Sequence, residues 1–353
     1  MKLIMGMLLS HKLYAWKYVK TDGIMINSYE LLITKKSIIN DIVKMSIRRL
    51  LDLDNKIMIF IDSGGFQYLK HNRSVKLERL IDLYLKIISV NDDNIFLVSL
   101  DLPPIPHDNL RNRNKKITKT ISNYRQLLRS LSKSDIDIRK IIPVIHLTTN
   151  KVLLQKQIES YGDAEIVGIG GLVPYVLRRG PKDSRLIAFA FIHLVKRMLK
   201  EYIGHEKVHV FGLGAPSVIP FLRVLGVYST DSMTWRVKAA YGKIILPGCG
   251  ERHVTDRVVN FGKRKLSPDE YERLLKLLDE FNRVSREKIS FDDLRRDFTK
   301  RAIFNFWVLN MHAHNHDGFM VPRIFRKLMV RVKEIMELSD DEILEFIASR
   351  FKH

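Results

Sequence analysis

The hexapeptide DSGGFQ at residues 62–67 concentrates several groups that could do chemistry. It follows an apolar run, residues 57–61, that is typical of a fully buried parallel strand. A carboxylate such as Asp62 at the end of a buried strand is costly to desolvate, so it requires partners or a chemical role. The two glycines allow a tight turn and the close approach of a ligand, and the Gln67 amide both donates and accepts hydrogen bonds. The stretch predicts the floor of a site for a planar polar ligand, with an ordinary strand-to-loop turn as the alternative.

Similar residues follow later apolar runs along the chain. They are Asp101, His146, Gly170, Gly212 and Asp231. Strand and helix patterns alternate through this region, which predicts a parallel sheet covered by helices. The number of units and the length favour a (β/α)8 TIM barrel over a doubly wound sheet. Because the carboxyl ends of all barrel strands meet at one face, these residues are expected to line one site.

The expected fold is an α/β (β/α)8 TIM barrel with a helical C-terminal extension. Residues 1–265 form the catalytic barrel, with the core motifs in 55–245, and residues 266–353 form a helical part that completes and extends it. The expected strands are 2–9, 23–33, 57–61, 95–100, 141–145, 166–169, 208–211, 227–230 and 243–246. The expected helices are 37–51, 75–90, 110–131, 151–161, 184–202, 217–224, 234–241, 268–284, 291–311, 321–336 and 340–351. The Gly- and charge-rich stretch 247–264 is expected to be a loop.

The formal net charge of +21 is unusually high for a chain of 353 residues. Such a surplus makes a polyanion the natural partner, either nucleic acid or an anionic membrane surface. The basic residues are spread along the chain, so the charge is expected on a folded face. A Lys- and Arg-rich thermophile surface is the alternative, but such surfaces usually balance their signs.

Cysteine and hydropathy patterns limit the other classes. Cys249 is the single cysteine, which excludes an intramolecular disulfide and a Cys-rich zinc site. The start of the chain, residues 1–16, is interpreted as a first strand and not as a signal peptide. No apolar stretch is long enough to span a bilayer, so we expect no membrane partner and a cytoplasmic location.

Three motifs in order carry a family resemblance. Residues 62–67 (DSGGFQ), 168–172 (GIGGL) and 212–216 (GLGAP), followed by Asp231, resemble the tRNA-guanine transglycosylase family over residues 55–245. The resemblance implies a (β/α)8 barrel that exchanges guanine in a polynucleotide for a 7-deazaguanine, such as a preQ0-type base.

The chain also departs from that family. Members usually carry a zinc site of three cysteines and a histidine after the nucleophile, which one cysteine cannot supply, so no metal or other cofactor is expected. Archaeal tRNA enzymes usually carry further C-terminal RNA-binding domains, and none is visible here. His146 stands where the family usually has Gln. These features resemble the DpdA-type enzymes that place 7-deazaguanines in DNA, which favours DNA over tRNA.

The resemblance assigns roles to the strand-end residues. Asp231 is the nucleophile that attacks the sugar C1′, and Asp62 is the general acid/base, in the manner of a retaining glycosidase. The base-binding residues are Ser63, Gln67, Asp101, His146, Gly170, Gly171 and Leu172. Purely structural roles remain open for three of these residues. Asp101 could be a turn residue, Asp231 a helix N-cap and His146 a core histidine.

The expected phosphate contacts lie near strand carboxyl ends. They are Arg111, Arg113, Lys115, Arg178, Arg179, Lys182, Arg236 and Lys238. His312, His314 and His316 suggest a metal, but only His312 and His316 share a helix face and no third ligand is evident. A free thiol and a loop histidine are expected for Cys249 and His253.

Several functions remain alternatives to base exchange on DNA. They are the same exchange on tRNA, a non-catalytic nucleic-acid-binding barrel or accessory subunit, and a barrel hydrolase for a small nucleotide. Retention of both Asp62 and Asp231 argues against a non-catalytic role, and the high positive charge argues against a small-nucleotide hydrolase. Pairing into a homodimer is left open.

Overall fold

The computed structural model describes the chain except for residues 35, 72, 74, 89–93, 135, 178–182, 257–263, 315–324 and 351–353. Nine strands run parallel around a ring. They are β1 (Lys2–Gly6), β2 (Gly23–Asn27), β3 (Met58–Asp62), β4 (Ile95–Val98), β5 (Ile141–Ile142), β6 (Val144–His146), β7 (Val167–Gly170), β8 (Val208–Val210) and β9 (Ser229–Ser232).

Pro143 explains why nine strands make an eight-stranded barrel. It separates β5, which pairs with β4, from β6, which pairs with β7, so the segment 141–146 acts as one strand. Proline has no N–H to donate to a ladder, while its carbonyl accepts the amide of Gly168 at 2.8 Å. The other seam joins β1 to β9, with Ile4 opposite Asp231. The (β/α)8 prediction is therefore confirmed.

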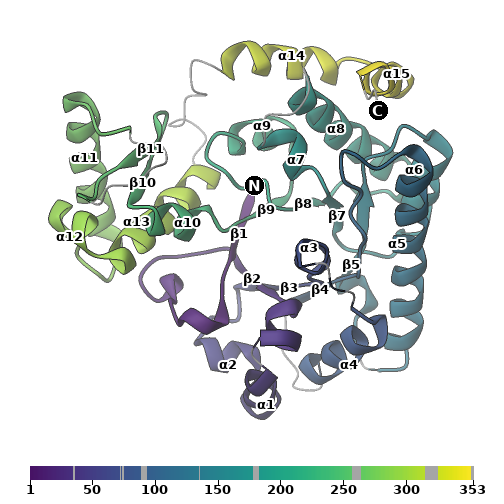
Figure 1. The fold of residues 1–353 in the computed structure, drawn as a ribbon, viewed down its shortest axis with the longest axis horizontal. Coiled ribbons are helices and arrows are strands. Elements are labelled where there is room, and N and C mark those ends of the chain that lie inside the picture. The colour runs from purple at the N-terminus through teal and green to yellow at the C-terminus, as the bar shows by residue number, and fades with distance from the viewer. Residues whose placement is uncertain are drawn as a thin grey trace.

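Helices surround this ring (Figure 1). Those up to β9 are α1 (Lys36–Met45), α2 (Ile47–Leu51), α3 (Gly65–Lys70), α4 (Leu77–Ile88), α5 (Leu110–Leu131), α6 (Lys151–Glu159), α7 (Val173–Val176), α8 (Ser184–Ile203) and α9 (Ile219–Val224). After β9 come α10 (Thr234–Ala240), α11 (Pro268–Val284), α12 (Phe291–Arg296), α13 (Phe298–His314), α14 (Arg326–Met336) and α15 (Asp340–Arg350). The short α3 is seen end-on near the centre of the ring in Figure 1.

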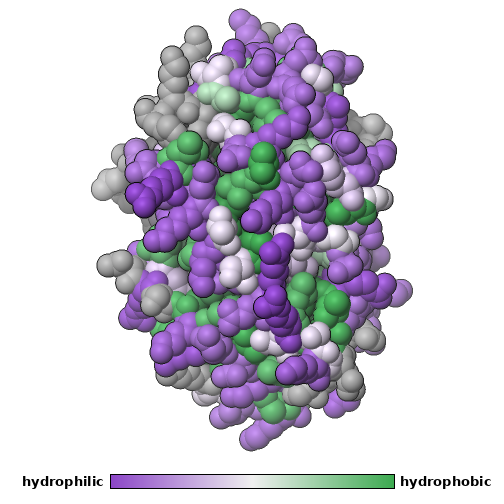
Figure 2. Space-filling view, turned by 90° about the vertical axis from the view of Figure 1, so that its right-hand side faces the viewer, coloured by the Kyte–Doolittle hydropathy of each residue, from purple (hydrophilic) through white to green (hydrophobic). Residues whose placement is uncertain are grey.

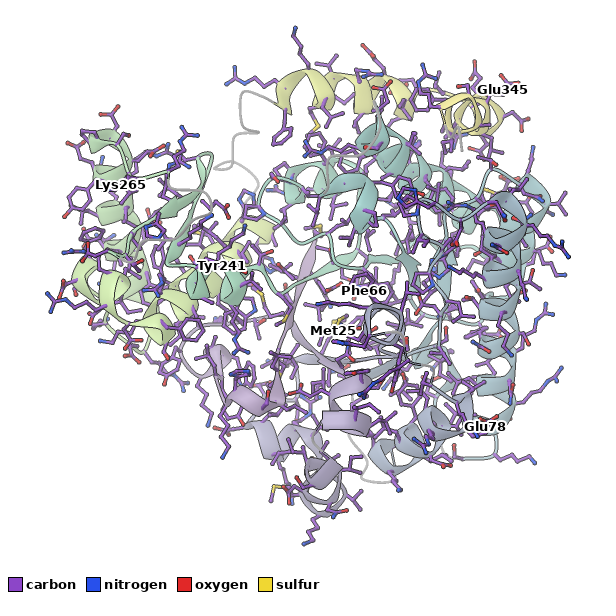
Figure 3. The ribbon with its side chains drawn as sticks, viewed as in Figure 1. Met25, Phe66, Glu78, Tyr241, Lys265 and Glu345 are labelled. Carbon is purple, nitrogen blue, oxygen red and sulfur yellow. The ribbon has the colours of Figure 1, made fainter. Side chains whose placement is uncertain are left out.

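Alternation along the strands divides the core into an inner and an outer layer. A buried cluster inside the barrel includes Ile4, Met25, Phe60 and Val144, and Met25 lies near the centre of the ring in Figure 3. The intervening residues face the helices. Because Asp62 has the same parity as Phe60, its side chain points into the barrel at the top of β3.

The part after β9 forms a unit on the outer side of β1. The strands β10 (Lys243–Leu246) and β11 (Gly250–His253) pair antiparallel, so the loop predicted for 247–264 is wrong at 250–253. Leu3 and Met5 share one buried cluster with Phe281, Phe304 and other residues of the helices that follow. α13 packs against α10 and β1 and so covers the barrel where its first and last strands meet.

The segment after β2 also differs from its prediction. The expected strand 23–33 ends at Asn27, and a π-helix occupies Glu30–Thr34. The cause is tertiary, since the Glu30 carboxylate accepts the amides of Leu9 and Ser10 at 3.0 and 2.9 Å. Ser28 donates to the carbonyl of Ser63 at 2.6 Å, which turns the chain at the barrel rim.

The surface over α5 is polar. Figure 2, which faces the right-hand side of Figure 1, shows hydrophilic side chains over most of that face. Within the described residues, no helix combines the length and apolar character needed to cross a bilayer.

Candidate active site

Asp62 and Asp231 lie at the same mouth of the barrel. Asp231 pairs in register with the inward-facing Ile4, so its side chain also points into the barrel. Both Asp231 and Asp101 are close enough to Asp62 for their charges to affect its ionisation. Residues 169 positions apart in sequence therefore share one site.

Asp62 is a carboxyl group that favours its protonated form. Burial, followed by the charges of Asp101 and Asp231, raises its pKa from 3.8 to about 7. Its Oδ2 accepts hydrogen bonds from Asn27 Nδ2 at 2.6 Å and from the Gly64 amide at 3.2 Å. These donors favour the ionised form, but they do not outweigh burial and two like charges. A proton on Asp62 near neutral pH suits a general acid.

Asp231 is held differently. Its Oδ1 accepts the Gly212 amide at 2.6 Å and lies 3.3 Å from His209 Nε2. The Asp231 side chain is 13% exposed. Within the described residues Oδ2 of Asp231 has no hydrogen-bond partner. One oxygen is thus anchored, and the other is available to attack an electrophile.

His209 is a site residue that the sequence analysis missed. It lies on β8, fully buried, with its ring 4.9 Å from Phe60 and 4.5 Å from Phe211. Nδ1 lies 2.9 Å from Ser229 Oγ, which fixes the ring so that Nε2 faces Asp231. A lone histidine between two valines of an apolar strand was the available signal. His209 positions the carboxylate of Asp231.

Asn27 and Phe66 are two further residues of the mouth. Asn27 was placed inside a longer predicted strand, but it ends β2 directly opposite Asp62. Phe66 on α3 is 52% exposed and lies over the ring in Figure 3. An exposed aromatic ring beside a polar site is a surface on which a base can stack.

Asp101 is oriented from two sides. Ser63 Oγ donates to Asp101 Oδ1 at 3.2 Å, and His146 Nε2 lies 3.2 Å from Asp101 Oδ2. Ser63 is fully buried beneath it. At Gly65 an added Cβ would lie 2.5 Å from Asp101 Oδ1, so only glycine fits there. The second glycine of the motif therefore gives Asp101 its place at the mouth.

Two polar side chains at the mouth keep unused hydrogen-bonding groups. Among the described residues, Gln67 Oε1 and both ring nitrogens of His146 are buried without a hydrogen bond of good geometry. Buried polar atoms of this kind are costly unless a ligand or water completes them. Gly170 and Gly171 approach the His146 ring, since a Cβ on either would lie 3.0 to 3.4 Å from it. Leu172 is fully buried directly after them.

The predicted phosphate contacts have different environments. Arg111 and Lys115 are exposed on the first turns of α5. Arg113 is buried and donates to the carbonyls of Ile105 and Leu147, so the structure makes it a support of the loop and not a surface cation.

The remaining predicted phosphate contacts also differ from one another in their surroundings. Lys238 forms an ion pair with Glu251, whereas the guanidinium of Arg236 has no hydrogen bond or ion pair within the described chain. Arg178, Arg179 and Lys182 lie outside the described residues.

The residues after β9 do not fit a zinc ion. Cys249 Sγ accepts a hydrogen bond from the Arg273 guanidinium at 3.1 Å, and a cation there opposes a metal. His312 Nε2 lies 2.9 Å from the carbonyl of Pro216, and His314 Nε2 lies 2.8 Å from Asp22 Oδ2. His316 is outside the described residues, which hold no group of three His, Cys, Asp or Glu able to bind a metal.

Comparisons with known proteins agree with this geometry. No protein-family model matches the chain. The chain is 23% identical over 320 residues to the tRNA-guanine(15) transglycosylase of Nanoarchaeum equitans (strain Kin4-M). The alignment covers 89% of this chain and 71% of that protein. Together with the barrel and the ordered motifs at its mouth, this similarity supports a distant relationship to the tRNA-guanine transglycosylase superfamily.

Proposed function

We propose that the protein exchanges guanine in a polynucleotide for a 7-deazaguanine base through a covalent intermediate on Asp231. The observation that supports this is the pairing of two carboxyl groups in different surroundings at one mouth. Asp62 has a pKa of about 7, while Asp231 is anchored by the Gly212 amide. A retaining glycosyl transfer needs such a pair, an acid that can also act as a base and an ionised nucleophile.

The reaction is balanced with these two residues alone. Asp231 Oδ2 forms a bond to the sugar C1′ as the C1′–N9 bond to guanine breaks, and the Asp62 proton passes to the departing base. The incoming base then gives its N9 proton to Asp62 and attacks C1′, and the carboxylate of Asp231 is released. Asp62 is protonated again at the end, so one exchange resets the site.

The remaining residues of the mouth carry groups that can form hydrogen bonds with the edge of a guanine base. Asp101 accepts from N1–H and N2–H of guanine, an edge that adenine lacks. Gln67 and His146 carry the unpaired groups that bond the rest of the base, and the backbone at Gly170 and Gly171 donates to O6. Such a site admits only an unstacked base, so the enzyme acts on a flipped nucleotide or a single strand.

For the polynucleotide we favour DNA, with tRNA as the second candidate. The single cysteine, which cannot supply the family's three-cysteine zinc site, and His146 in place of Gln resemble the DNA-modifying branch. The named activity of the similar archaeal protein favours tRNA. Both candidates use the same two aspartates, so one experiment separates them.

The experiment is incubation of the protein with radiolabelled guanine and either double-stranded DNA, single-stranded DNA or tRNA. We expect label to enter DNA, and a protein–DNA adduct to survive denaturing electrophoresis. Asp231→Ala is expected to abolish both signals, because it removes the nucleophile. Asp279→Ala, which removes an exposed aspartate on α11, serves as the matched control.

Label in tRNA alone would select the second candidate. Absence of label from every polynucleotide, together with an adduct that persists in Asp231→Ala, would contradict the proposed chemistry.

A further inference from the structure

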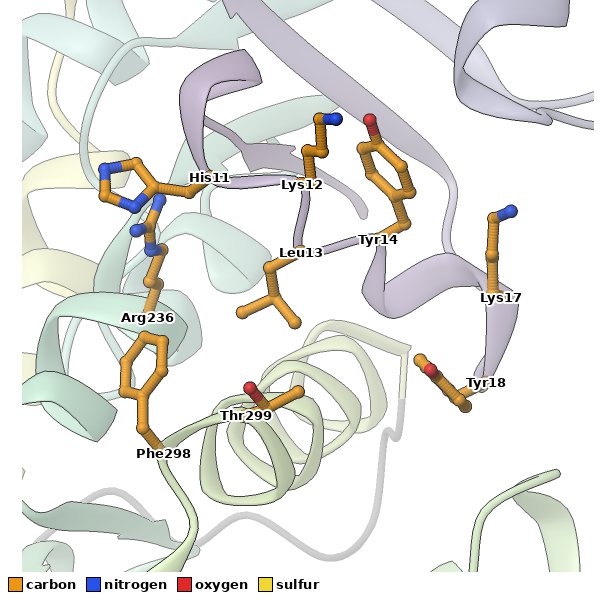
Figure 4. A pocket seen from close by; sticks show the side chains of 9 residues that line it. All are labelled: His11, Lys12, Leu13, Tyr14, Lys17, Tyr18, Arg236, Phe298 and Thr299. Atoms are coloured by element: carbon orange, nitrogen blue, oxygen red, sulfur yellow. The ribbon is translucent and has the colours of Figure 1, made fainter.

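The described structure contains a cavity that is lined by none of the residues assigned above to base exchange. Its volume is about 340 Å³, and its walls come from the segment 11–18, from α10 and from the start of α13. We call it the α10–α13 pocket. Figure 4 shows Arg236 and Phe298 on one side and Tyr14, Lys17 and Tyr18 on the other. Basic and aromatic side chains thus face a shared space.

Arg236 is the residue that most clearly requires a ligand. It is half-buried, and burial lowers the pKa of its guanidinium even though the charge of Glu30 opposes this shift. The Glu30 carboxylate accepts the amides of Leu9 and Ser10. The Arg236 guanidinium itself makes no hydrogen bond or ion pair within the described residues. A partly desolvated guanidinium of this kind is suited to bind a phosphate.

The other charges around the pocket leave it positive. Lys17 pairs with Asp52 at 3.0 Å. The Asp297 carboxylate caps α13 and accepts the amides of Thr299 at 2.6 Å and Lys300 at 3.1 Å. Lys12 is exposed and has no ion pair in the described structure. The acids near the pocket are therefore engaged, while Arg236 and Lys12 keep their charge available.

The aromatic residues supply flat surfaces. The ring of Tyr14 lies 5.2 Å from that of Trp16, and Lys17 Nζ lies 5.6 Å from the Tyr14 centroid, which holds the tyrosine in place. Tyr18 and Phe298 add two further rings to the walls. Aromatic rings next to cations are how proteins bind single strands, because every base can stack on a ring.

The pocket is on the same face of the barrel as Asp231. β9 ends at Ser232 and α10 begins at Thr234, so Arg236 is in the first turn after the nucleophile strand. Trp235 Nε1 donates to the carbonyl of Gly6 at 3.1 Å, which fixes this turn to the end of β1. A strand whose target base enters the mouth therefore reaches the pocket within a few nucleotides.

We propose that the α10–α13 pocket binds a nucleotide flanking the target guanine. Its phosphate contacts Arg236 and Lys12, and its base stacks against the rings of Tyr14, Tyr18 or Phe298. The identity of the bound strand as substrate depends on the proposed function, whereas the binding itself does not. The pocket gives the enzyme a second binding site for the strand. It keeps the neighbouring nucleotide unstacked while the target base is exchanged.

The first test measures the affinity of the full-length protein for a fluorescent single-stranded DNA oligonucleotide with one guanine, at several salt concentrations. We expect Arg236→Ala to weaken binding roughly tenfold at low salt and to reduce the salt slope by about one. Arg129→Ala is the matched control. Arg129 is exposed in the last turn of α5, at the opposite face of the barrel, and its loss should leave affinity and slope nearly unchanged.

The second test places 5-iodouridine on either side of the guanine and maps the photocrosslinked peptide by mass spectrometry. We expect crosslinks in the segment 11–18 or at Phe298. Equal binding of the Arg236→Ala and Arg129→Ala variants, or crosslinks only elsewhere, would overturn the proposal. If the wild-type protein incorporates no guanine at all, the base-exchange function is contradicted. Both binding tests still show whether the α10–α13 pocket binds a nucleotide.

Discussion

Asp62 at the barrel mouth and Glu270 at the start of α11 are both carboxyl groups that accept backbone amides, yet their pKa values shift in opposite directions. Arg252 donates to Glu270 at 2.7 Å from its Nε and through a second guanidinium nitrogen, and the pKa of Glu270 falls to about 2. Asp62 faces Asp101 and Asp231, and its pKa rises to about 7. The first carboxylate stabilises the fold, whereas the second costs stability and retains a reactive proton.

The surroundings of the two groups explain this difference. Near β11 the chain satisfies its buried polar groups, since Asn305 alone bonds the amide of Ile245 and the carbonyls of Trp235 and Lys243. At the mouth, Gln67 and His146 keep unpaired atoms. One region is completed by its own residues, and the other leaves polar groups that a ligand could complete. This contrast separates structure from function more clearly than burial alone.

The largest effect is expected from Asp62→Asn. The amide keeps the hydrogen bond from Asn27 but cannot deliver a proton, so exchange should slow by roughly a thousandfold. The measurement is single-turnover incorporation of labelled guanine. Activity within a few-fold of the wild type would contradict the proposed contrast between Asp62 and Glu270, because Asp62 would then not be the general acid. Asp82→Asn on α4, at an exposed position, controls for a change of charge.

Glu270→Gln should affect the stability of the fold and not the exchange reaction. Arg252 is 2% exposed, so removing its partner leaves a buried charge unpaired and should cost about 3 kcal/mol of unfolding free energy. Denaturant unfolding monitored by circular dichroism measures this loss. Exchange per folded molecule should remain, because Glu270 is not a residue of the mouth. Glu272→Gln, at an exposed position two residues further along α11, is the control and should change the unfolding free energy little.

The pH dependence of these two variants should differ in sign. The folded-state pKa of Asp62 is raised from 3.8 to about 7, so the wild type loses stability as pH rises through this range. Asp62→Asn should therefore gain roughly 4 kcal/mol over the wild type between pH 4 and pH 8. The Glu270 ion pair is present above pH 4.5 and is lost toward pH 2, so the cost of Glu270→Gln should shrink only in acid. Unfolding curves at roughly pH 2.5, 4, 6 and 8 test both. A gain for Asp62→Asn that stays constant with pH would rule out the raised pKa.

Local signals allowed much of the fold to be predicted from sequence. The bounds of α5 and α11 match the prediction, because Asn109 caps the first and the Ser267–Glu270 capping box starts the second. The strand-end positions of Asp62, Asp101, His146 and Asp231 followed from hydrophobic patterning combined with barrel geometry.

Tertiary contacts explain what could not be predicted. The turn after Asn27 depends on Glu30 and Ser28 bonding to distant backbone groups. The pairing of β11 with β10 starts from a glycine-rich stretch that has no strand pattern of its own. The burial of Arg113 was accessible in principle, since it lies four residues before the buried Ile117 on the same helix face.

The pairing of β1 with β9 has a consequence for the timing of synthesis. Leu3 pairs with Thr230 across this seam, so β1 has no neighbour on one side until the residues up to Thr230 have left the ribosome. At about 5–20 residues per second this delay is on the order of tens of seconds. Long-range parallel pairings form late, and a nascent chain therefore does not bring Asp231 opposite Asp62 until the ring closes.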